Sequence, residues 1–316
     1  MTIKKVAAIQ MESRIGNLDY NLSHVRELAL EAIEQGAEII ALPEFFTTSI
    51  ALDDRVYAAV LPPENPALDL LMELAADHNV LIGGSYLEKR GAEVYNSYKL
   101  VGPEGLIGHH DKDQPTMIEN AFYIGGDTTG IHQTRFGRVG TAVCWETIRS
   151  RTVARLANNI DFLMTGSHWW TSAQNWTALS SIGESVDAES RATLFDAPGK
   201  LSRYLKVANI HASHCGKLHG GFPLLPMQSL AIPMETTLIG EAQIIDRNGQ
   251  IVARRRESEG AGIVSATLDL RPREEEPIIP DGFWISKPGL FINLSWWQQN
   301  WVGKRIYKQA KKEGKF

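Results

Sequence analysis

Short apolar runs alternate with amphipathic segments along most of this chain, and that alternation limits the possible folds more than any other feature of the sequence. The apolar runs have the length of buried strands and cover residues 5–10, 38–42, 80–86, 139–143, 160–165 and 204–211. The segments between them carry apolar residues at helical spacing and cover residues 22–36, 65–77, 149–157 and 176–193. Strands that alternate with helices in this way are typical of an α/β fold.

Two antiparallel hairpins are also expected, and they would give the α/β fold mixed sheets. Their paired strands are residues 94–101 with 106–110 and residues 242–246 with 251–256. The second pair flanks Arg247-Asn-Gly-Gln250, and its Asn-Gly step suits a type I′ turn. With a last strand over residues 262–270, this pattern favours one α/β domain, residues 1–270, over two separate domains.

Two segments depart from the alternation. Residues 216–240 are rich in Gly, Pro, Leu and Met without a clear period, so we interpret them as a long loop that forms a lid over a pocket. Residues 271–316 form a distinct C-terminal tail that contains four of the eight tryptophans and ends in a run of lysines and arginines. We expect the basic residues to form a solvated helix face. The tryptophans suggest that the tail packs on a partner subunit of a homodimer or larger homo-oligomer.

The composition narrows the function classes. The 316 residues are 43% hydrophobic and 22% charged with a formal net charge of −5, which is ordinary for a globular protein and does not suggest a nucleic-acid surface. No apolar run approaches the roughly 20 residues that span a membrane, and the start of the chain lacks a signal-peptide pattern, so a cytoplasmic location is expected. Two cysteines are too few for a disulfide scaffold.

The strongest local signal is Arg138-Val-Gly-Thr-Ala-Val-Cys144-Trp-Glu, where an apolar strand leads directly into a cysteine. A helix is predicted a few residues later, so the thiol would lie near a helix N-terminus, where aligned N–H groups lower the pKa of cysteine. An unreactive core cysteine explains the segment equally well.

Three charged residues also stand at or after predicted strand ends. Glu44 follows a buried run through Leu-Pro, and burial would raise the pKa of its carboxyl and suit it to general-base work. Lys112 could stabilise the negative charge that develops when a thiolate attacks an sp or sp2 carbon, and Glu119 lies seven positions further on. Taken singly, each is more often a surface residue.

Taken together, the four residues occur in the order Glu44, Lys112, Glu119, Cys144. In that order, with the helix before Leu-Pro-Glu44-Phe and the late segment Ile-Ile-Asp-Arg-Asn-Gly-Gln-Ile-Val, the chain resembles the nitrilase superfamily of carbon–nitrogen hydrolases from about residue 4 to about residue 270. The resemblance implies a four-layer αββα sandwich, with the tail outside it, and a dimer in which sandwiches stack.

The same resemblance implies a role for each residue. Cys144 would be the nucleophile, Glu44 the general base and Lys112 the group that stabilises the tetrahedral species. Glu119 would orient the lysine and the substrate. No cofactor and no metal are implied, and the partner would be a small-molecule nitrile or amide.

Two motifs and two departures from them bear on the branch within the superfamily. Pro115-Thr-Met-Ile-Glu119 and Cys144-Trp-Glu146 resemble the nitrile-hydrolysing branch. Asn120 stands where that branch usually has Arg, and Thr147 where it usually has Asn. On the strength of the two motifs we expect hydrolysis of a nitrile. Because of the two departures, an amidase or carbamoyl hydrolase is the alternative.

Five further residues are candidate substrate contacts: Trp145, Glu146, His168, Trp169 and His211. The tryptophans, with Trp170, could line an aromatic pocket near Cys144 or pack under the following helix. A lone His168 or a hydrogen-bonded His211 loop could equally be structural. The segment from His211 to His219, with His214 and Cys215, contains zinc-binding residue types, but its spacing fits no standard zinc pattern. A metal-dependent hydrolase and a non-catalytic scaffold with this fold remain the contrasting hypotheses.

Overall fold

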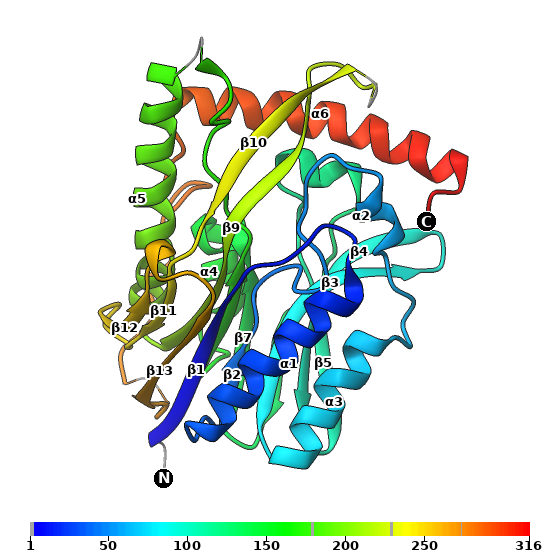
Figure 1. Cartoon of the computed structure of the whole chain (residues 1–316). Helices are drawn as coiled ribbons and strands as arrows, with labels where there is room; N and C mark the ends of the chain where they lie inside the picture. The colour runs from blue at the N-terminus through cyan, green and yellow to red at the C-terminus, as the bar shows by residue number, and fades with distance from the viewer. Residues whose placement is uncertain (1–2, 178–179, 228–229, 273) are drawn as a thin grey trace.

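The structure is a computed structural model that describes residues 3–177, 180–227, 230–272 and 274–316 (Figure 1). The first half of the chain contains β1 (Ile3–Met11), α1 (Leu18–Glu34), β2 (Ile39–Ala41), α2 (Arg55–Ala58), α3 (Pro66–His78), β3 (Leu81–Arg90), β4 (Glu93–Gly102), β5 (Gly105–Asp111), η1 (Met117–Ala121), β6 (Ile131–Thr134), β7 (Gly137–Val143) and η2 (Cys144–Ile148). The second half contains α4 (Ser150–Leu156), β8 (Phe162–Ser167), α5 (Ser180–Leu205), β9 (Ala208–Pro223), β10 (Ala231–Ile239), β11 (Ala242–Ile245), β12 (Ile251–Arg255), η5 (Glu257–Glu259), β13 (Gly262–Asp269) and α6 (Leu290–Glu313).

Local sequence signals set the bounds of helix α3. The side chain of Asn65 accepts hydrogen bonds from the backbone N–H groups of Ala67 and Leu68, and Pro66 occupies the first turn. At the other end, Asn79 has a φ of 56°, a left-handed conformation that ends the helix. The predicted helix over residues 65–77 is confirmed.

The strands form one hydrogen-bonded path in the order β5-β4-β3-β2-β1-β9-β8-β7-β6. Strand β1 lies at its centre and pairs in parallel with β2 and β9, while β13 pairs with it antiparallel. The β3–β4–β5 meander and the β6–β7 pair are antiparallel. This mixture of directions is the mixed α/β arrangement that the sequence predicts.

The path folds into two sheet layers because side chains alternate along each strand. On β1, Val6 and Ala8 join a core shared with Val143 and Met164 from the other half of the path. The intervening side chains, such as Ile9, join a separate core beneath α1 and α3. On the far side, a third cluster lies between β7, β8 and the helices α4 and α5. The order helix, sheet, sheet, helix gives the expected four layers, with α1 and α3 on one side in Figure 1 and α5 on the other.

Residues 216–240 are not a long loop, so that interpretation is wrong for the described part of the segment. Strands β9 and β10 form a long antiparallel ribbon, with Cys215 opposite Ile239 and Pro223 opposite Ala231. Gly220 has a packing role, because a Cβ atom there would lie 2.3 Å from the Cβ atom of Ala51. Residues 228–229 lie outside the described residues.

The β11–β12 hairpin is confirmed, but its turn is not type I′. A type I′ turn needs positive φ at both central residues, and here only Gly249 has one, with a φ of 76°. Asp246 explains the difference, because its carboxylate accepts hydrogen bonds from the backbone N–H groups of Asn248 and Gln250. Its carbonyl accepts the N–H of Gly249, which closes the turn. The predicted strand at 204–211 also starts late, since Tyr204 and Leu205 belong to α5.

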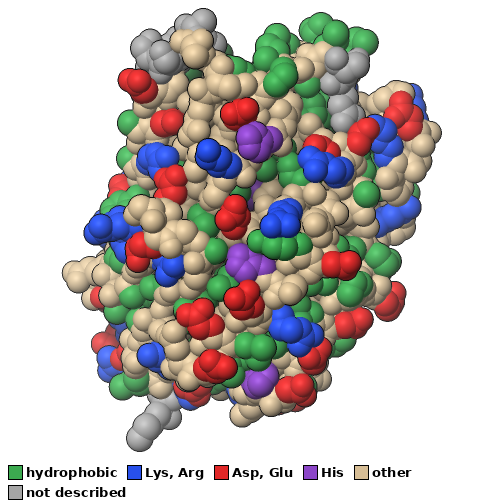
Figure 2. Space-filling view, in the orientation of Figure 1, with side chains coloured by type: hydrophobic (Ala, Val, Ile, Leu, Met, Phe, Trp, Pro, Cys, Tyr) green, Lys and Arg blue, Asp and Glu red, His purple; other side chains and the backbone are tan. Residues whose placement is uncertain are grey.

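The C-terminal tail ends in α6, which crosses one end of the molecule beside the β9–β10 ribbon (Figure 1). Its lysines and arginines between 304 and 312 are exposed, as expected for a solvated face. Its opposite face packs on η1 of the same chain. Hydrophobic side chains gather near the tip of the ribbon at the top of the molecule (Figure 2). The large apolar side chains that remain exposed at this tip and on α6 are Leu224, Leu225, Met227, Leu230, Leu290, Leu294, Trp297 and Trp301. Contact of this tail with a partner subunit stays a prediction, as does its boundary at residue 271.

The structure gives no helix that could cross a membrane: none in the described ranges is both long enough and apolar enough.

Candidate active site

The four residues singled out in the sequence meet in one buried site at the carboxyl ends of strands. Glu44 follows β2, Lys112 follows β5, and Cys144 follows β7 as the first residue of η2, while Glu119 lies within η1. Each of the four side chains is buried. Because these strands end at the same edge of the folded sheet path, positions 100 residues apart in sequence converge there.

Cys144 occupies a sharp turn between strand and helix. Its φ of 53° lies in the left-handed region, which is uncommon for a residue with a side chain and is often found at active sites. The turn is held by the Thr147 hydroxyl, which donates to the carbonyl of Cys144 at 2.6 Å. The thiol therefore lies at a fixed point between β7 and η2.

Lys112 connects the two glutamates. Its Nζ donates to Oε1 of Glu44 at 2.8 Å and to Oε2 of Glu119 at 2.6 Å, and all three side chains are excluded from solvent. The two carboxylates raise the pKa of Lys112 well above its ordinary value although burial opposes the charge. The lysine is therefore a permanent ammonium ion in this site.

Glu44 has the environment of a general base. Its Oε1 also accepts from Nδ2 of Asn96 at 2.8 Å, and its Oε2 accepts from the backbone N–H of His168 at 3.0 Å. Burial raises the pKa of Glu44 to about 8, more than the nearby Lys112 lowers it, and a side-chain hydrogen bond connects it with Cys144. The expectation that burial raises this pKa is confirmed.

Glu119 is fixed from its own helical turn. Its Oε2 accepts the backbone N–H of Thr116 at 2.9 Å and the hydroxyl of Tyr123. Its Oε1 is buried without a hydrogen-bond partner among the described residues. A buried carboxylate oxygen is costly to leave unpaired, so this atom is available to accept a hydrogen bond from a bound molecule.

The expectation of a low pKa for Cys144 is wrong. Burial and the nearby Glu44 carboxylate raise the pKa of the thiol well above its usual value, and these effects exceed the opposing effect of Lys112. The predicted helix is present as α4, but it begins at Ser150, and the short turn η2 separates it from Cys144. The resting cysteine is thus a thiol whose proton must be accepted by a neighbouring base.

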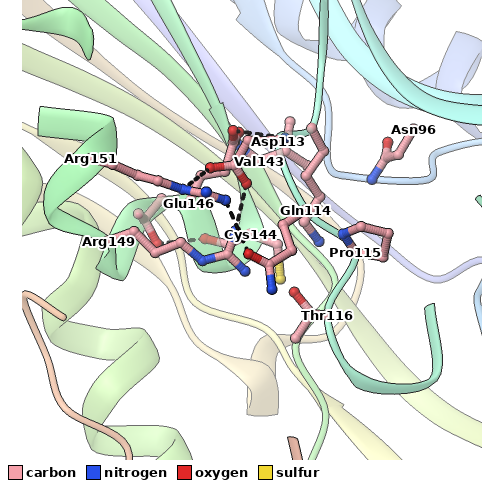
Figure 3. A network of polar contacts seen from close by, with 12 residues as sticks. Asn96, Asp113, Gln114, Pro115, Thr116, Val143, Cys144, Glu146, Arg149 and Arg151 are labelled. Carbon is pink, nitrogen blue, oxygen red and sulfur yellow. Dashed lines mark hydrogen bonds and ion pairs between the residues drawn. The ribbon is translucent and has the colours of Figure 1, made fainter. Parts of the chain in front are cut away.

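Glu146 ties the segments that carry Cys144 and Lys112 together (Figure 3). Its buried carboxylate accepts the backbone N–H groups of Val143 at 2.7 Å and Asp113 at 3.2 Å. It also lies 3.0 Å from Nε2 of His110. Burial alone would raise the pKa of Glu146, but its contacts with His110, Arg155 and the backbone N–H of Val143 hold that pKa below its ordinary value. The structure therefore gives Glu146 a position behind the site and does not bring it into the substrate pocket.

Asp113 extends this network toward the surface. Its two carboxylate oxygens pair with Arg149 at 2.5 Å and Arg151 at 2.6 Å, both beyond the cysteine turn (Figure 3). Two ionic links thus connect the segment after Lys112 with the segment after Cys144. No local sequence pattern indicates this network, because the partners of Asp113 lie more than 30 positions away.

A cavity of about 250 Å³ opens beside Cys144 and Glu119. Three of the candidate substrate contacts, Trp145, His168 and Trp169, line it. The structure also brings in residues that sequence reasoning missed, from the β9–β10 ribbon and from α6: Phe222, Met234, Phe291, Ile292, Ser295 and Gln299. No local pattern in the sequence indicates these residues, because they reach the cavity only through the fold.

The histidines at 211 and 214 contact protein groups and do not form the zinc site considered from the sequence. His211 lies within β9, hydrogen-bonded to Thr165 and Ser167, and it is not among the described residues that line the cavity. His214 contacts the carbonyl of Glu44 at 2.6 Å. Within the described residues, the only compact group of three potential ligands is Glu44, Glu119 and Cys144, and its carboxylates already bond Lys112.

Comparisons with known proteins agree with this geometry. A family described as carbon-nitrogen hydrolase matches residues 5–275 of the chain. The curated "Nitrilase" of Pyrococcus abyssi is 34% identical over 146 residues, which is 45% of this chain and 56% of that protein. "Omega-amidase NIT2-A" of Xenopus laevis is 32% identical over 151 residues, 44% of this chain and 54% of that protein. The chain thus matches about half the length of these relatives.

A solved structure shows the same fold. The crystal structure of Saccharomyces cerevisiae Nit3, described as a member of branch 10 of the nitrilase superfamily, superposes with a TM-score of 0.63. The superposition covers 85% of this chain and 90% of that one at 19% sequence identity. The α/β architecture predicted from the sequence is therefore shared with a protein whose sequence is largely different.

Proposed function

Because this chain belongs to the carbon–nitrogen hydrolase family of the nitrilase superfamily, we propose that it hydrolyses a nitrile to a carboxylic acid and ammonia with Cys144 as a covalent nucleophile. The observation that carries the proposal is the buried contact of one ammonium ion, Lys112, with two carboxylates beside a thiol. This arrangement supplies a nucleophile, a base and a fixed positive charge in one buried cluster, of which Cys144 and Glu119 line the cavity.

The reaction starts with a proton transfer. Glu44 in its carboxylate form accepts the proton of Cys144 as the sulfur attacks the nitrile carbon. Glu44 then passes this proton to the nitrile nitrogen, which gives a thioimidate and restores the carboxylate. Because the pKa of Glu44 is raised to about 8 and that of the thiol is also raised, the transfer is better matched than it would be for an ordinary carboxylate.

Lys112 and Glu119 act on the charge that develops. The Lys112 ammonium stabilises negative charge on the substrate without any rearrangement, because both of its carboxylate contacts are already formed. The unpaired Oε1 of Glu119 accepts an N–H of the thioimidate and of the tetrahedral species that follows it.

Two water molecules complete the hydrolysis. The first adds to the thioimidate, and cleavage of the carbon–nitrogen bond releases ammonia and leaves a thioester on Cys144. The second, deprotonated by Glu44, adds to the thioester, and cleavage of the carbon–sulfur bond releases the acid and restores the thiol. Dividing the reaction at a covalent intermediate replaces one difficult displacement with two easier ones.

An amidase or carbamoyl hydrolase is the alternative, because an amide reaches the same thioester without the first hydration. The sequence segments Pro115-Thr-Met-Ile-Glu119 and Cys144-Trp-Glu146 and the relatives named nitrilase favour the nitrile. The relative named omega-amidase supports the alternative.

Matched substrate pairs test the proposal. Ammonia release is measured with a nitrile and the amide of the same acid, using the wild-type chain and Cys144→Ala as the control. We expect a higher kcat/KM for the nitrile and no ammonia release by the variant. Turnover of the amide alone would overturn the nitrile assignment, and an active Cys144→Ala would overturn the covalent mechanism.

A further inference from the structure

We infer that the cavity accepts a compact substrate that carries an aromatic ring and no anionic group, and that helix α6 determines this preference. The inference rests on the proposed function for the reacting end of the substrate and concerns the remainder of the molecule. Its observations are the aromatic walls of the cavity, the lack of a cation on those walls, the cavity volume and the contact of α6 with η1.

Six aromatic side chains line the cavity. They are Trp145, Trp169, Trp170, Trp176, Phe222 and Phe291. The rings of Trp145 and Trp169 lie 5.6 Å apart at 36°, and those of Trp176 and Phe222 lie 5.2 Å apart at 89°. Such tilted and edge-on pairs present both ring faces and ring edges, which are the surfaces that a substrate ring contacts most favourably.

The walls offer little to an anionic substrate. Among the described residues that line the cavity there is no lysine or arginine. A carboxylate on the part of the substrate remote from the reacting carbon would therefore lose its hydration without gaining a cation. Substrates without an anionic group are favoured for this reason.

The volume sets the size of the substrate. A closed apolar cavity of roughly 150 Å³ is enough to bind benzene, and pockets for drug-sized ligands start at roughly 300 Å³. The cavity here, about 250 Å³, lies between these values. It has room for one ring joined by a short chain to the reacting carbon.

Helix α6 of the C-terminal tail forms one wall of the cavity. Phe291, Ile292, Ser295 and Gln299 recur at helical spacing on one side of it and line the cavity. Nε2 of Gln299 donates to the carbonyl of Pro223 at 2.9 Å, which joins this wall to the β9–β10 ribbon.

Helix α6 packs closely against η1, the turn that carries Glu119. A Cβ atom at Gly303 would lie 2.8 Å from the Cβ atom of Asn120, so the glycine allows close contact between α6 and η1. Nδ2 of Asn120 also donates to Oδ1 of Asn300 at 2.8 Å. Because Glu119 directly precedes Asn120 in the chain, these contacts fix the position of the α6 wall relative to the carboxylate of Glu119.

The first experiment compares substrates on the wild-type chain. Ammonia release is measured with phenylacetonitrile, propionitrile and cyanoacetate, and with the amides of the same three acids. We expect kcat/KM for the aromatic compound to exceed that of the other two by about tenfold or more. Equal or better use of cyanoacetate or propionitrile would overturn the inference. An enzyme that cleaves only the amides, with the same aromatic preference, would refute the nitrile proposal while supporting this one.

The second experiment isolates the role of α6. Phe291 and Leu294 are similarly exposed on this helix, at 56% and 58%, but only Phe291 lines the cavity. Phe291→Arg places a cation at the cavity wall, so we expect the ratio of kcat/KM for phenylacetonitrile to that for cyanoacetate to fall about tenfold or more. Leu294→Arg adds the same charge outside the cavity and should leave the ratio unchanged. A ratio that is unaffected by Phe291→Arg, or that falls equally in both variants, would overturn the assignment of α6.

Discussion

Replacing Lys112 with Met tests the buried ionic contact on which the proposed chemistry depends. The substitution keeps an unbranched side chain of similar length but removes the ammonium ion, and it leaves Glu44 and Glu119 buried with no cation between them. We expect the variant to lose both activity and stability, for two separable reasons.

The magnitudes follow from the geometry. At the contact distances of 2.8 and 2.6 Å, each ion pair is worth about 6 kcal/mol at an effective dielectric constant of about 20, before the cost of burying the charges is subtracted. Removing one partner of a buried pair typically lowers the free energy of unfolding by about 3–5 kcal/mol. One of the two carboxylates should bind a proton to limit the repulsion. Loss of a fixed electrostatic donor should lower kcat about 100- to 1,000-fold.

Urea denaturation and ammonia release measure the two effects. Circular dichroism first confirms that Lys112→Met folds. Glu119→Gln and the double variant complete a mutant cycle, in which the double variant should be more stable than the sum of the single effects predicts by about 1 kcal/mol or more. A Lys112→Met enzyme within tenfold of the wild-type kcat, with a free energy of unfolding within about 0.5 kcal/mol, would refute the reasoning.

Three further predictions concern other parts of the site. Glu146→Gln removes the buried negative charge that pairs with Arg155 and weakens the link between Val143 and Asp113. Urea denaturation should therefore show a loss of about 3 kcal/mol and kcat should fall, whereas unchanged values would contradict the bridging role. Alkylation of Cys144 by iodoacetamide should accelerate as the pH rises through about 8, because Glu44 then loses its proton and can accept the proton of the thiol. In Glu44→Gln the midpoint of this pH profile should move upward. An identical profile in both proteins would exclude Glu44 as the base. Cys215 has its pKa raised to about 12 by burial in β9, so Cys215→Ser should retain activity within about twofold, and a large loss in the ammonia assay would contradict a single catalytic cysteine.

Features with local physical causes were predictable from the sequence. The start of α3 follows from the cap at Asn65 and the proline after it, and both signals lie within two adjacent positions. The buried strands leading to Glu44 and Cys144 follow from short apolar runs bounded by turn residues. The order of Glu44, Lys112, Glu119 and Cys144 indicated a single site through its resemblance to the nitrilase superfamily.

Features with distant causes were not predictable. The β9–β10 ribbon depends on pairing between positions such as Cys215 and Ile239, and the glycine at 220 obscures it because glycine usually weakens a strand. The pKa of Cys144 depends on burial and on Glu44, 100 positions earlier, whereas the local pattern suggested only a helix N-terminus. The α6 wall of the cavity reaches the site from the far end of the chain, so no spacing or motif near Cys144 indicates Phe291.

The mass of a covalent adduct tests the central claim most directly. The wild-type chain is mixed with phenylacetonitrile, quenched in acid during turnover, digested and measured by mass spectrometry. We predict that the peptide containing Cys144 gains the mass of the substrate-derived acyl or imidoyl group, that the peptide containing Cys215 gains none, and that Cys144→Ala forms no adduct. Continued ammonia release by Cys144→Ala, or turnover by the wild-type chain with Cys144 unmodified and an adduct on another residue, would contradict it.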